Sequence, residues 1–187
     1  VESPDYSLDN IPQEYPGYGT TDLKAPAVQV ELADGCSITK LRYKSHKIYG
    51  GKPEIEGLPA VYTENSSEAD TLEITLEDTF AGVEVTLLYT VFKELNVICR
   101  SSIIKNTSDS HMYVNKALSM NIDFMSDDYK YMHLPGVWAR EKQAEINDVH
   151  KGSQGFESRR GASGHFENPF MAVMDKNATE DYGNVYG

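Results

Sequence analysis

The sequence has few cysteines, few basic residues and no long apolar run, and each shortage excludes a class of protein. Its 187 residues contain only two cysteines, Cys36 and Cys99, which form no CxxC pair; this argues against a disulfide framework and favours the reducing cytoplasm. Lys and Arg number 17 against 29 Asp and Glu, for a net charge of -12. We expect no nucleic-acid partner, since phosphate binding needs clustered cations. No segment approaches the roughly 20 apolar residues of a membrane span, so we expect no membrane partner.

Motifs that carry common chemistry are also missing. The five histidines form no HxH, HExxH or Cys-His pairing, so we predict no metal site. The sequence contains no Gly-x-Ser-x-Gly elbow, no Walker loop and no dinucleotide fingerprint, and we therefore expect no cofactor. Paired carboxylates could serve glycoside hydrolysis, but among 29 acids no pair distinguishes itself. We assign no catalytic residue.

Period-two alternation of apolar and polar residues predicts an antiparallel all-β fold. The pattern is clearest in residues 71–77 and continues through 83–91, 97–104 and 112–124, with short polar links between them. Four strands joined in this way predict a meander. Residues 28–32 alternate as well, so we expect the sheet structure to begin before residue 70.

Three other segments lack this alternation. Residues 140–149 are rich in helix formers but have no apolar stripe, and a helix there is the less favoured alternative. Residues 9–26 and 151–169 are rich in Gly and Pro and are predicted to be long ordered loops, where functional residues often lie. The length favours one domain over residues 1–187, although the first residue is Val1 and residues 184–187 resemble an interrupted strand, which is typical of a fragment.

Aromatic side chains and an Arg pair stand out in these loops and beside the lone tryptophan. Such groups contact both sugar rings and protein interfaces. The alternative is that the tyrosines pack a loop onto the sheet and the Arg pair meets acidic residues of this chain. The candidate residues for contacting a substrate or another domain are Tyr15, Tyr18, Asp22, Trp138, Arg159, Arg160 and His165.

Five separated segments of the sequence resemble the amino-terminal region of α-galactosidases of glycoside hydrolase family 36. They follow one another in the order found in that family and extend through nearly the whole chain. The segments are residues 13–22 with the following Ala-Pro-Ala, residues 42–49, 57–60, 133–141 and 157–170.

The resemblance implies a fold and a place in a larger protein. It implies an antiparallel β-supersandwich of the galactose-mutarotase-like type, here incomplete at both ends, and a (β/α)8 barrel that lies outside this chain. The family's retaining mechanism uses an Asp nucleophile in a Lys-Trp-Asp motif and an Asp acid/base, both on the barrel. No Lys-Trp-Asp occurs here, because the only tryptophan, Trp138, precedes Ala139. No catalytic role is therefore carried over.

Two functions remain open. In the first, the chain is a non-catalytic structural and assembly domain of an α-galactosidase that hydrolyses terminal α-galactosides such as raffinose and melibiose. Its implied partners are the barrel of the same polypeptide, which binds the oligosaccharide, and neighbouring subunits of a homo-oligomer, expected to be a tetramer. In the second, the chain is a free-standing carbohydrate-binding β-sandwich that holds a sugar through Trp138, Tyr15 or Tyr18. A downstream barrel would support only the first.

Overall fold

The computed structural model describes residues 11–20, 24–57, 60–162 and 164–187. The chain divides into two compact units, Val1–Asp123 and Phe124–Gly187. Within the described ranges every regular element is a β-strand and all pairings between strands are antiparallel, so the predicted all-β antiparallel fold is confirmed. In these same ranges we find no helix with the length and apolar character needed to cross a membrane.

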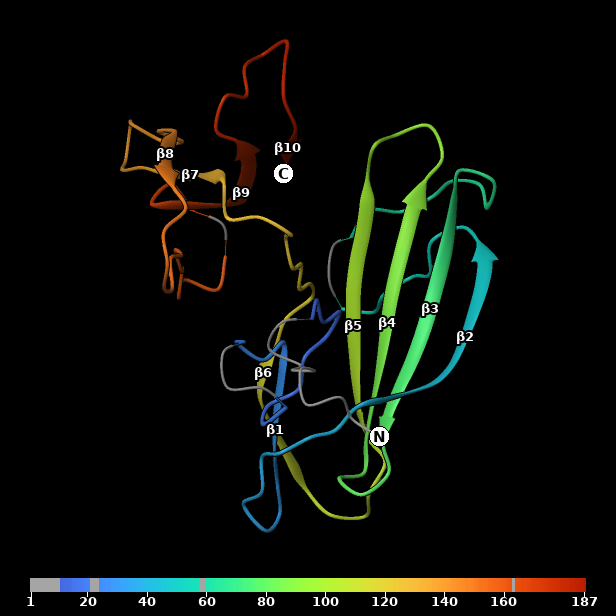
Figure 1. The fold of residues 1–187 in the computed structure, drawn as a ribbon. Coiled ribbons are helices and arrows are strands. Elements are labelled where there is room, and N and C mark those ends of the chain that lie inside the picture. The colour runs from blue at the N-terminus through green and yellow to red at the C-terminus, as the bar shows by residue number, and fades with distance from the viewer. Residues whose placement is uncertain (1–10, 21–23, 58–59, 163) are drawn as a thin grey trace. The chain divides into compact units, whose positions relative to one another are not determined.

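The first unit contains a sheet of four long strands in the order β2-β3-β4-β5 (Figure 1). The alternating segments at 71–77, 83–91 and 97–104 lie in β3, β4 and β5, and the predicted meander is confirmed for these three. The turn between β3 and β4 uses Gly82 at φ 64°, a backbone conformation that favours glycine. The four strands are β2 (Arg42–Gly50), β3 (Ala69–Asp78), β4 (Val83–Phe92) and β5 (Ile98–Asn106).

The prediction that residues 112–124 add a fourth strand to this meander is wrong. Strand β6 (Met112–Ala117) leaves the sheet and pairs with β1 (Val28–Leu32) in a separate two-stranded ribbon. Both strands pack on one face of the long sheet, where Val28 and Val30 join Val85 in a single core cluster. A further strand in the same sheet would leave that face exposed to water, whereas the crossing ribbon buries it.

Burial along β4 changes face part of the way along the strand. Val83, Val85 and Leu87 are each at most 1% exposed beneath the β1–β6 ribbon. Farther along the same face, Tyr89 is half-buried and Val91 is 47% exposed, because the ribbon does not extend over them.

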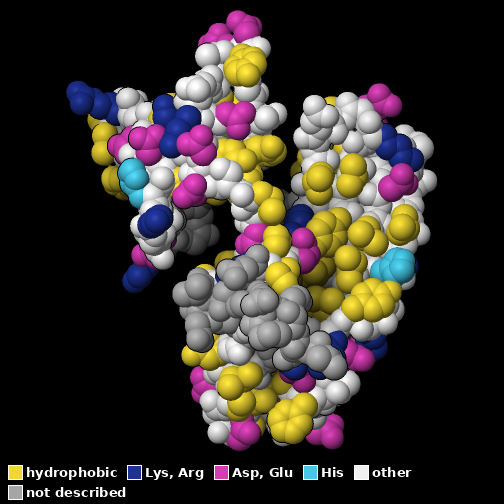
Figure 2. All heavy atoms as spheres, viewed as in Figure 1, with side chains coloured by type: hydrophobic (Ala, Val, Ile, Leu, Met, Phe, Trp, Pro, Cys, Tyr) yellow, Lys and Arg dark blue, Asp and Glu magenta, His cyan; other side chains and the backbone are white. Residues whose placement is uncertain are grey.

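On the opposite face Thr90 is buried instead. Its hydroxyl lies 2.8 Å from that of Thr71, which also donates to the carbonyl of Gly51 at 2.6 Å. The face that carries Val83, Val85 and Leu87 is therefore covered by the ribbon at one end only. Figure 2 shows hydrophobic side chains gathered over the strands on that partly covered face.

The second unit contains another four-stranded antiparallel sheet, in the order β10-β9-β7-β8. The possible helix at 140–149 is absent, because Ala139 and Lys142 adopt positive φ angles of 62° and 55° that no α-helix accepts. Part of that segment instead forms β8. The strands are β7 (Tyr129–Pro135), β8 (Glu145–Asp148), β9 (Glu167–Asp175) and β10 (Val185–Tyr186).

Candidate functional site

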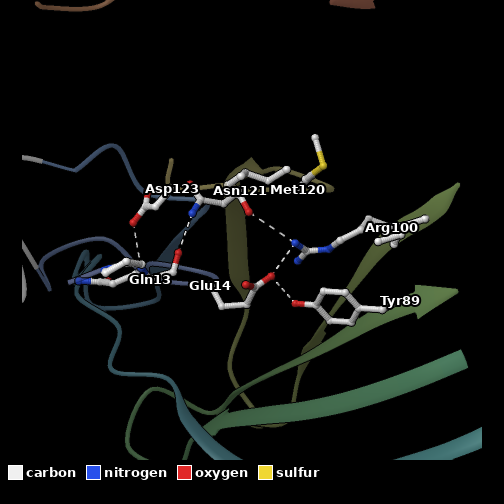
Figure 3. A pocket seen from close by; sticks show the side chains of 10 residues that line it. Gln13, Glu14, Tyr89, Arg100, Met120, Asn121 and Asp123 are labelled. Atoms are coloured by element: carbon white, nitrogen blue, oxygen red, sulfur yellow. Dashed lines mark hydrogen bonds and ion pairs between the residues drawn. The ribbon is translucent and has the colours of Figure 1, made fainter. Parts of the chain in front are cut away.

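Two loops that are far apart in the sequence meet beside β5 in the first unit. Asn121 donates from Nδ2 to the carbonyl oxygen of Gln13 at 2.7 Å. The backbone N–H of Gln13 donates to Oδ2 of Asp123 at 2.8 Å, and the ammonium of Lys24 forms an ion pair with the same carboxylate. These contacts hold the loops together as one wall of a pocket (Figure 3).

The opposite wall is the guanidinium of Arg100 lying over the ring of Tyr89. The two residues face each other in the β4–β5 register, and Cζ of Arg100 is 4.2 Å from the centroid of the Tyr89 ring. Nη1 of Arg100 donates to Oε1 of Glu14 at 2.7 Å, and the Tyr89 hydroxyl donates to the same oxygen (Figure 3). Three side chains from three segments are thus joined through one carboxylate oxygen.

One edge of this guanidinium is unsatisfied. The Arg100 side chain is only 8% exposed, and its Nε and Nη2 are buried without a hydrogen-bond partner among the residues that the structure describes. Leaving a buried donor unpaired costs about 1–3 kcal/mol, and more when the group is charged. In general, the Nε–Nη2 edge of an arginine can donate two parallel hydrogen bonds to a pair of oxygens.

The pocket has a volume of about 400 Å³ and is lined by both polar and apolar side chains. Ile98, Met120 and Ile122 are among the apolar ones, and each is about half exposed to solvent. The pocket therefore combines the ion-paired Arg100 with partly exposed apolar side chains.

The pKa values of two groups that line the pocket, Tyr89 and Asp123, are shifted. Burial and the hydrogen bond to Glu14 raise the pKa of the Tyr89 hydroxyl well above its ordinary value, so this group stays protonated at neutral pH. Burial alone would raise the pKa of the Asp123 carboxyl, but the Lys24 ammonium and the Gln13 N–H outweigh burial and lower it. Asp123 is consequently ionised at neutral pH.

This arrangement suits binding rather than proton transfer. An arginine does not give up its proton in proteins, and the Tyr89 hydroxyl is committed to Glu14. The Tyr89 hydroxyl and Nη1 of Arg100 hold the Glu14 carboxylate in place. The described contacts therefore brace the amino-terminal loop against β4 and β5.

The structure places the predicted candidates of the first loop in different surroundings. Tyr15 is 6% exposed within the core, and its hydroxyl donates to the carbonyl of Leu118 at 2.6 Å. Tyr18 is 43% exposed at the surface. Asp22 lies outside the described residues.

In the second unit two of the predicted candidates, Arg160 and His165, contact the same ring, that of Phe166. Trp138 is 82% exposed. Arg159 pairs with Glu157 of its own loop. Cζ of Arg160 is 5.3 Å from the centroid of the Phe166 ring, and the centroids of the His165 and Phe166 rings are 4.3 Å apart.

Sequence reasoning missed Arg100, Tyr89 and Glu14. One signal was available, because Arg100 is in phase with Ile98 and Ile104 on the inward face of a predicted strand, where a charge needs a partner. The partner itself comes from a loop 86 positions away, which alternation does not reveal. Among the described residues no group of three or more His, Cys, Asp or Glu side chains is arranged to hold a metal ion.

Comparison with known proteins gives a consistent family. The chain matches the model of the glycosyl hydrolase family 36 N-terminal domain over residues 1–187. The α-galactosidase AgaA of Geobacillus stearothermophilus is 52% identical over 182 residues, which are 97% of this chain and 25% of that protein. Mel36A of Lactobacillus acidophilus is 39% identical, with the same coverage of 97% and 25%.

The fold agrees with the sequence match. The crystal structure of the α-galactosidase AgaB from Geobacillus stearothermophilus has a TM-score of 0.93 and 50% identity to this chain, covering 96% of it and 25% of that structure. The chain spans about a quarter of the length of these relatives. With a match along all of its residues, at high identity and with the same fold, the chain belongs to the N-terminal domain family of glycoside hydrolase family 36.

Proposed function

We propose that this chain is the non-catalytic N-terminal domain of an α-galactosidase, supporting a catalytic barrel on the same polypeptide. The observation that carries the proposal is the coverage: nearly all of this chain aligns with only a quarter of each α-galactosidase. The Arg100 pocket agrees with this role, because each of its two carboxylates is held in an ion pair, Glu14 with Arg100 and Asp123 with Lys24.

The proposed substrates of the whole protein are terminal α-galactosides such as raffinose and melibiose, bound by the barrel. Support comes from a crystal structure of an AgaA variant in complex with raffinose, which is 50% identical to this chain and has a TM-score of 0.93 over 98% of it. The free thiols of Cys36 and Cys99 agree with a cytoplasmic protein, which is the location we propose.

The exposed candidates are proposed to contact the barrel or a neighbouring subunit of a homo-oligomer. Trp138 is 82% exposed and Tyr18 43%, and the Arg159 side chain is 87% exposed despite its ion pair. Aromatic and Arg side chains are enriched at protein interfaces. Replacing Tyr18 or Arg159 by Ala in the whole protein is expected to weaken assembly or activity and to leave the unfolding of this domain nearly unchanged.

The test is to sequence the gene on both sides of this segment and to express the complete reading frame. We expect a barrel with a Lys-Trp-Asp motif downstream, and hydrolysis of a chromogenic α-galactoside by the complete polypeptide. A reading frame without a barrel, or a complete polypeptide that does not cleave α-galactosides, would contradict the proposal.

The exposed indole of Trp138 favours one second candidate, a carbohydrate-binding module. Sugar rings stack on such faces, and this one is available to solvent. Isothermal titration of the protein with melibiose distinguishes the two functions. Binding that survives inactivation of any barrel and is abolished by Trp138→Ala would favour the module.

A further inference from the structure

A groove at one end of the long sheet in the first unit combines exposed apolar side chains with cations. It has a volume of about 640 Å³ and lies between the segment before β2 and the turn that joins β3 to β4. Phe80 of that turn is 95% exposed, and Ile38 of the segment is 60% exposed. Arg42 faces Glu77 in the β2–β3 register, so its side chain is on the side of the sheet opposite to the β1–β6 ribbon.

The turn that carries Phe80 is held in place by its own hydrogen bonds. Oδ1 of Asp78 accepts from the backbone N–H groups of Phe80 and Ala81, each at 3.0 Å. Oδ2 of the same carboxylate accepts from the backbone N–H of Lys40 at 2.7 Å, which ties the two sides of the groove together. A partner therefore meets a backbone that is already ordered, and binding costs less conformational entropy.

Two cations of the groove have no ion-pair partner among the described residues. The side chains of Lys40 and Arg42 make neither an ion pair nor a hydrogen bond within the part of the chain that the structure describes. Both acids of the groove are already engaged, since Asp78 accepts from backbone N–H groups and Glu77 pairs with Lys44 at 2.9 Å. The groove is thus a cationic site on a chain with a net charge of -12, and charge complementarity favours an acidic partner.

The turn between β9 and β10 in the second unit has the complementary character. Glu180 and Asp181 are exposed, and their carboxylates pair with none of the described residues. The next residue, Tyr182, is 75% exposed. The backbone N–H of Thr179 donates to the carbonyl of Tyr182 at 2.7 Å and closes the turn. Two carboxylates and an aromatic ring are therefore presented together on an ordered backbone.

We propose that the groove receives the β9–β10 turn of a second copy of this chain. Asp181 of the second copy pairs with Arg42, and Tyr182 of the second copy packs against Phe80. A two-fold axis makes the contact reciprocal, so that the groove of each copy holds the turn of the other. Because one exposed ion pair contributes little, the contact depends on this repetition and on burial of the two rings. The inference requires only two copies of this chain and is independent of the proposed function.

Another exposed acidic turn is a poorer occupant. In the connection between β2 and β3, the carboxylate of Glu68 accepts from the backbone N–H groups of Glu64 and Asn65, at 3.2 and 2.9 Å, and is committed to its own turn. Glu64 then offers a single carboxylate where the groove has two cations. A small inorganic anion is poorer still, because it would leave the exposed ring of Phe80 in water.

The experiment is sedimentation velocity of the polypeptide expressed from its complete reading frame. Arg42→Glu and Asp181→Arg each reverse one side of the contact, and a double variant carries both changes. Glu64→Lys is the matched control, because it reverses an exposed carboxylate that lines neither surface. Phe80→Ala removes a ring that is 95% exposed and should leave the melting temperature unchanged, so its effect on association is separate from folding.

We expect each single reversal to weaken self-association by about tenfold or more, because like charges then face each other twice in every pair of copies. An equimolar mixture of the two single variants should associate as the wild type does, since both contacts of a mixed pair join opposite charges. The double variant should recover association for the same reason. Phe80→Ala should weaken association, and Glu64→Lys should leave it unchanged.

Three results would overturn the inference. A wild type that stays monomeric, or single variants that associate as the wild type does, would mean that the groove is not a contact between copies. Recovery in the double variant without recovery in the mixture would mean that the two charges meet within one copy. Single variants that neither mixing nor the double change restores would mean that the groove receives a different surface. Hydrolysis of a chromogenic α-galactoside by the wild type tests the proposed function separately.

Discussion

The hydroxyl of Tyr15 joins the amino-terminal loop to the segment after β6, and its removal is the sharpest test of the first unit. It donates to the carbonyl of Leu118 at 2.6 Å and lies 3.1 Å from Oγ of Ser102. Ser102 donates to the same carbonyl at 2.9 Å. The carbonyl therefore has two donors, and each single substitution leaves one of them in place.

This sharing sets the magnitudes. Tyr15→Phe is expected to lower the free energy of unfolding by about 1 kcal/mol, the net value of one hydrogen bond whose acceptor stays satisfied. Ser102→Ala should cost a similar amount or less. The double variant removes both donors to Leu118, so its cost should exceed the sum of the two singles by about 0.5–1 kcal/mol, as expected for groups in one network.

Urea unfolding followed by circular dichroism measures all four proteins of this cycle. Tyr18→Phe is the matched control, because that ring is 43% exposed where the Tyr15 ring is 6% exposed, and we expect a change within about 0.5 kcal/mol. Strict additivity of Tyr15→Phe and Ser102→Ala, or an unchanged midpoint for Tyr15→Phe, would refute the argument that these hydroxyls share an acceptor in the folded state.

Three further predictions concern charge, backbone and activity. Asp123→Asn should lower the free energy of unfolding at pH 7 by about 1 kcal/mol through loss of the Lys24 ion pair. Folding lowers the pKa of the Asp123 carboxyl, so the stabilisation is present above the unfolded pKa of about 3.9 and is lost as the pH falls through the folded pKa. Urea unfolding of both proteins at several pH values measures this difference. Gly82→Ala should lower the melting temperature in a calorimetric scan, because φ is 64° and the added Cβ would lie 2.6 Å from Cβ of Ser108, and an unchanged value would contradict the strain. The purified chain should not hydrolyse a chromogenic α-galactoside, and turnover that is abolished by replacing one of its own acids would overturn its assignment as non-catalytic.

The sequence was informative wherever a single strand determines its own pattern. Residues 71–77 alternate because one face of β3 meets the core and the other meets water, and this requirement is local. The same is true of β4, whose Val83, Val85 and Leu87 are buried as their spacing predicts. Five segments in family order identified the fold, and the match over the whole chain confirms it.

Local patterns did not determine which strands pair or where polar side chains meet. Strand β6 alternates as the meander predicts, yet it pairs with β1, which lies some 80 residues earlier in the sequence, because the core face needed a covering layer. Residues 140–149 form no helix, because Ala139 and Lys142 have positive φ angles, which depend on how the turn packs and not on helix propensity. Loop residues had no such pattern at all.

The sequence by itself determined the positions of β3, β4 and β5, the β-class and the family, since alternation and family motifs are carried by neighbouring residues. Only the tertiary structure decided that Tyr15 belongs to the core, and that Glu14 meets Arg100 across 86 positions. A side chain's partner is fixed by the free energy of the whole packed arrangement, in which a buried charge must find an oxygen wherever the chain brings one. None of the residues that the structure describes supplies such an oxygen to Nε or Nη2 of Arg100.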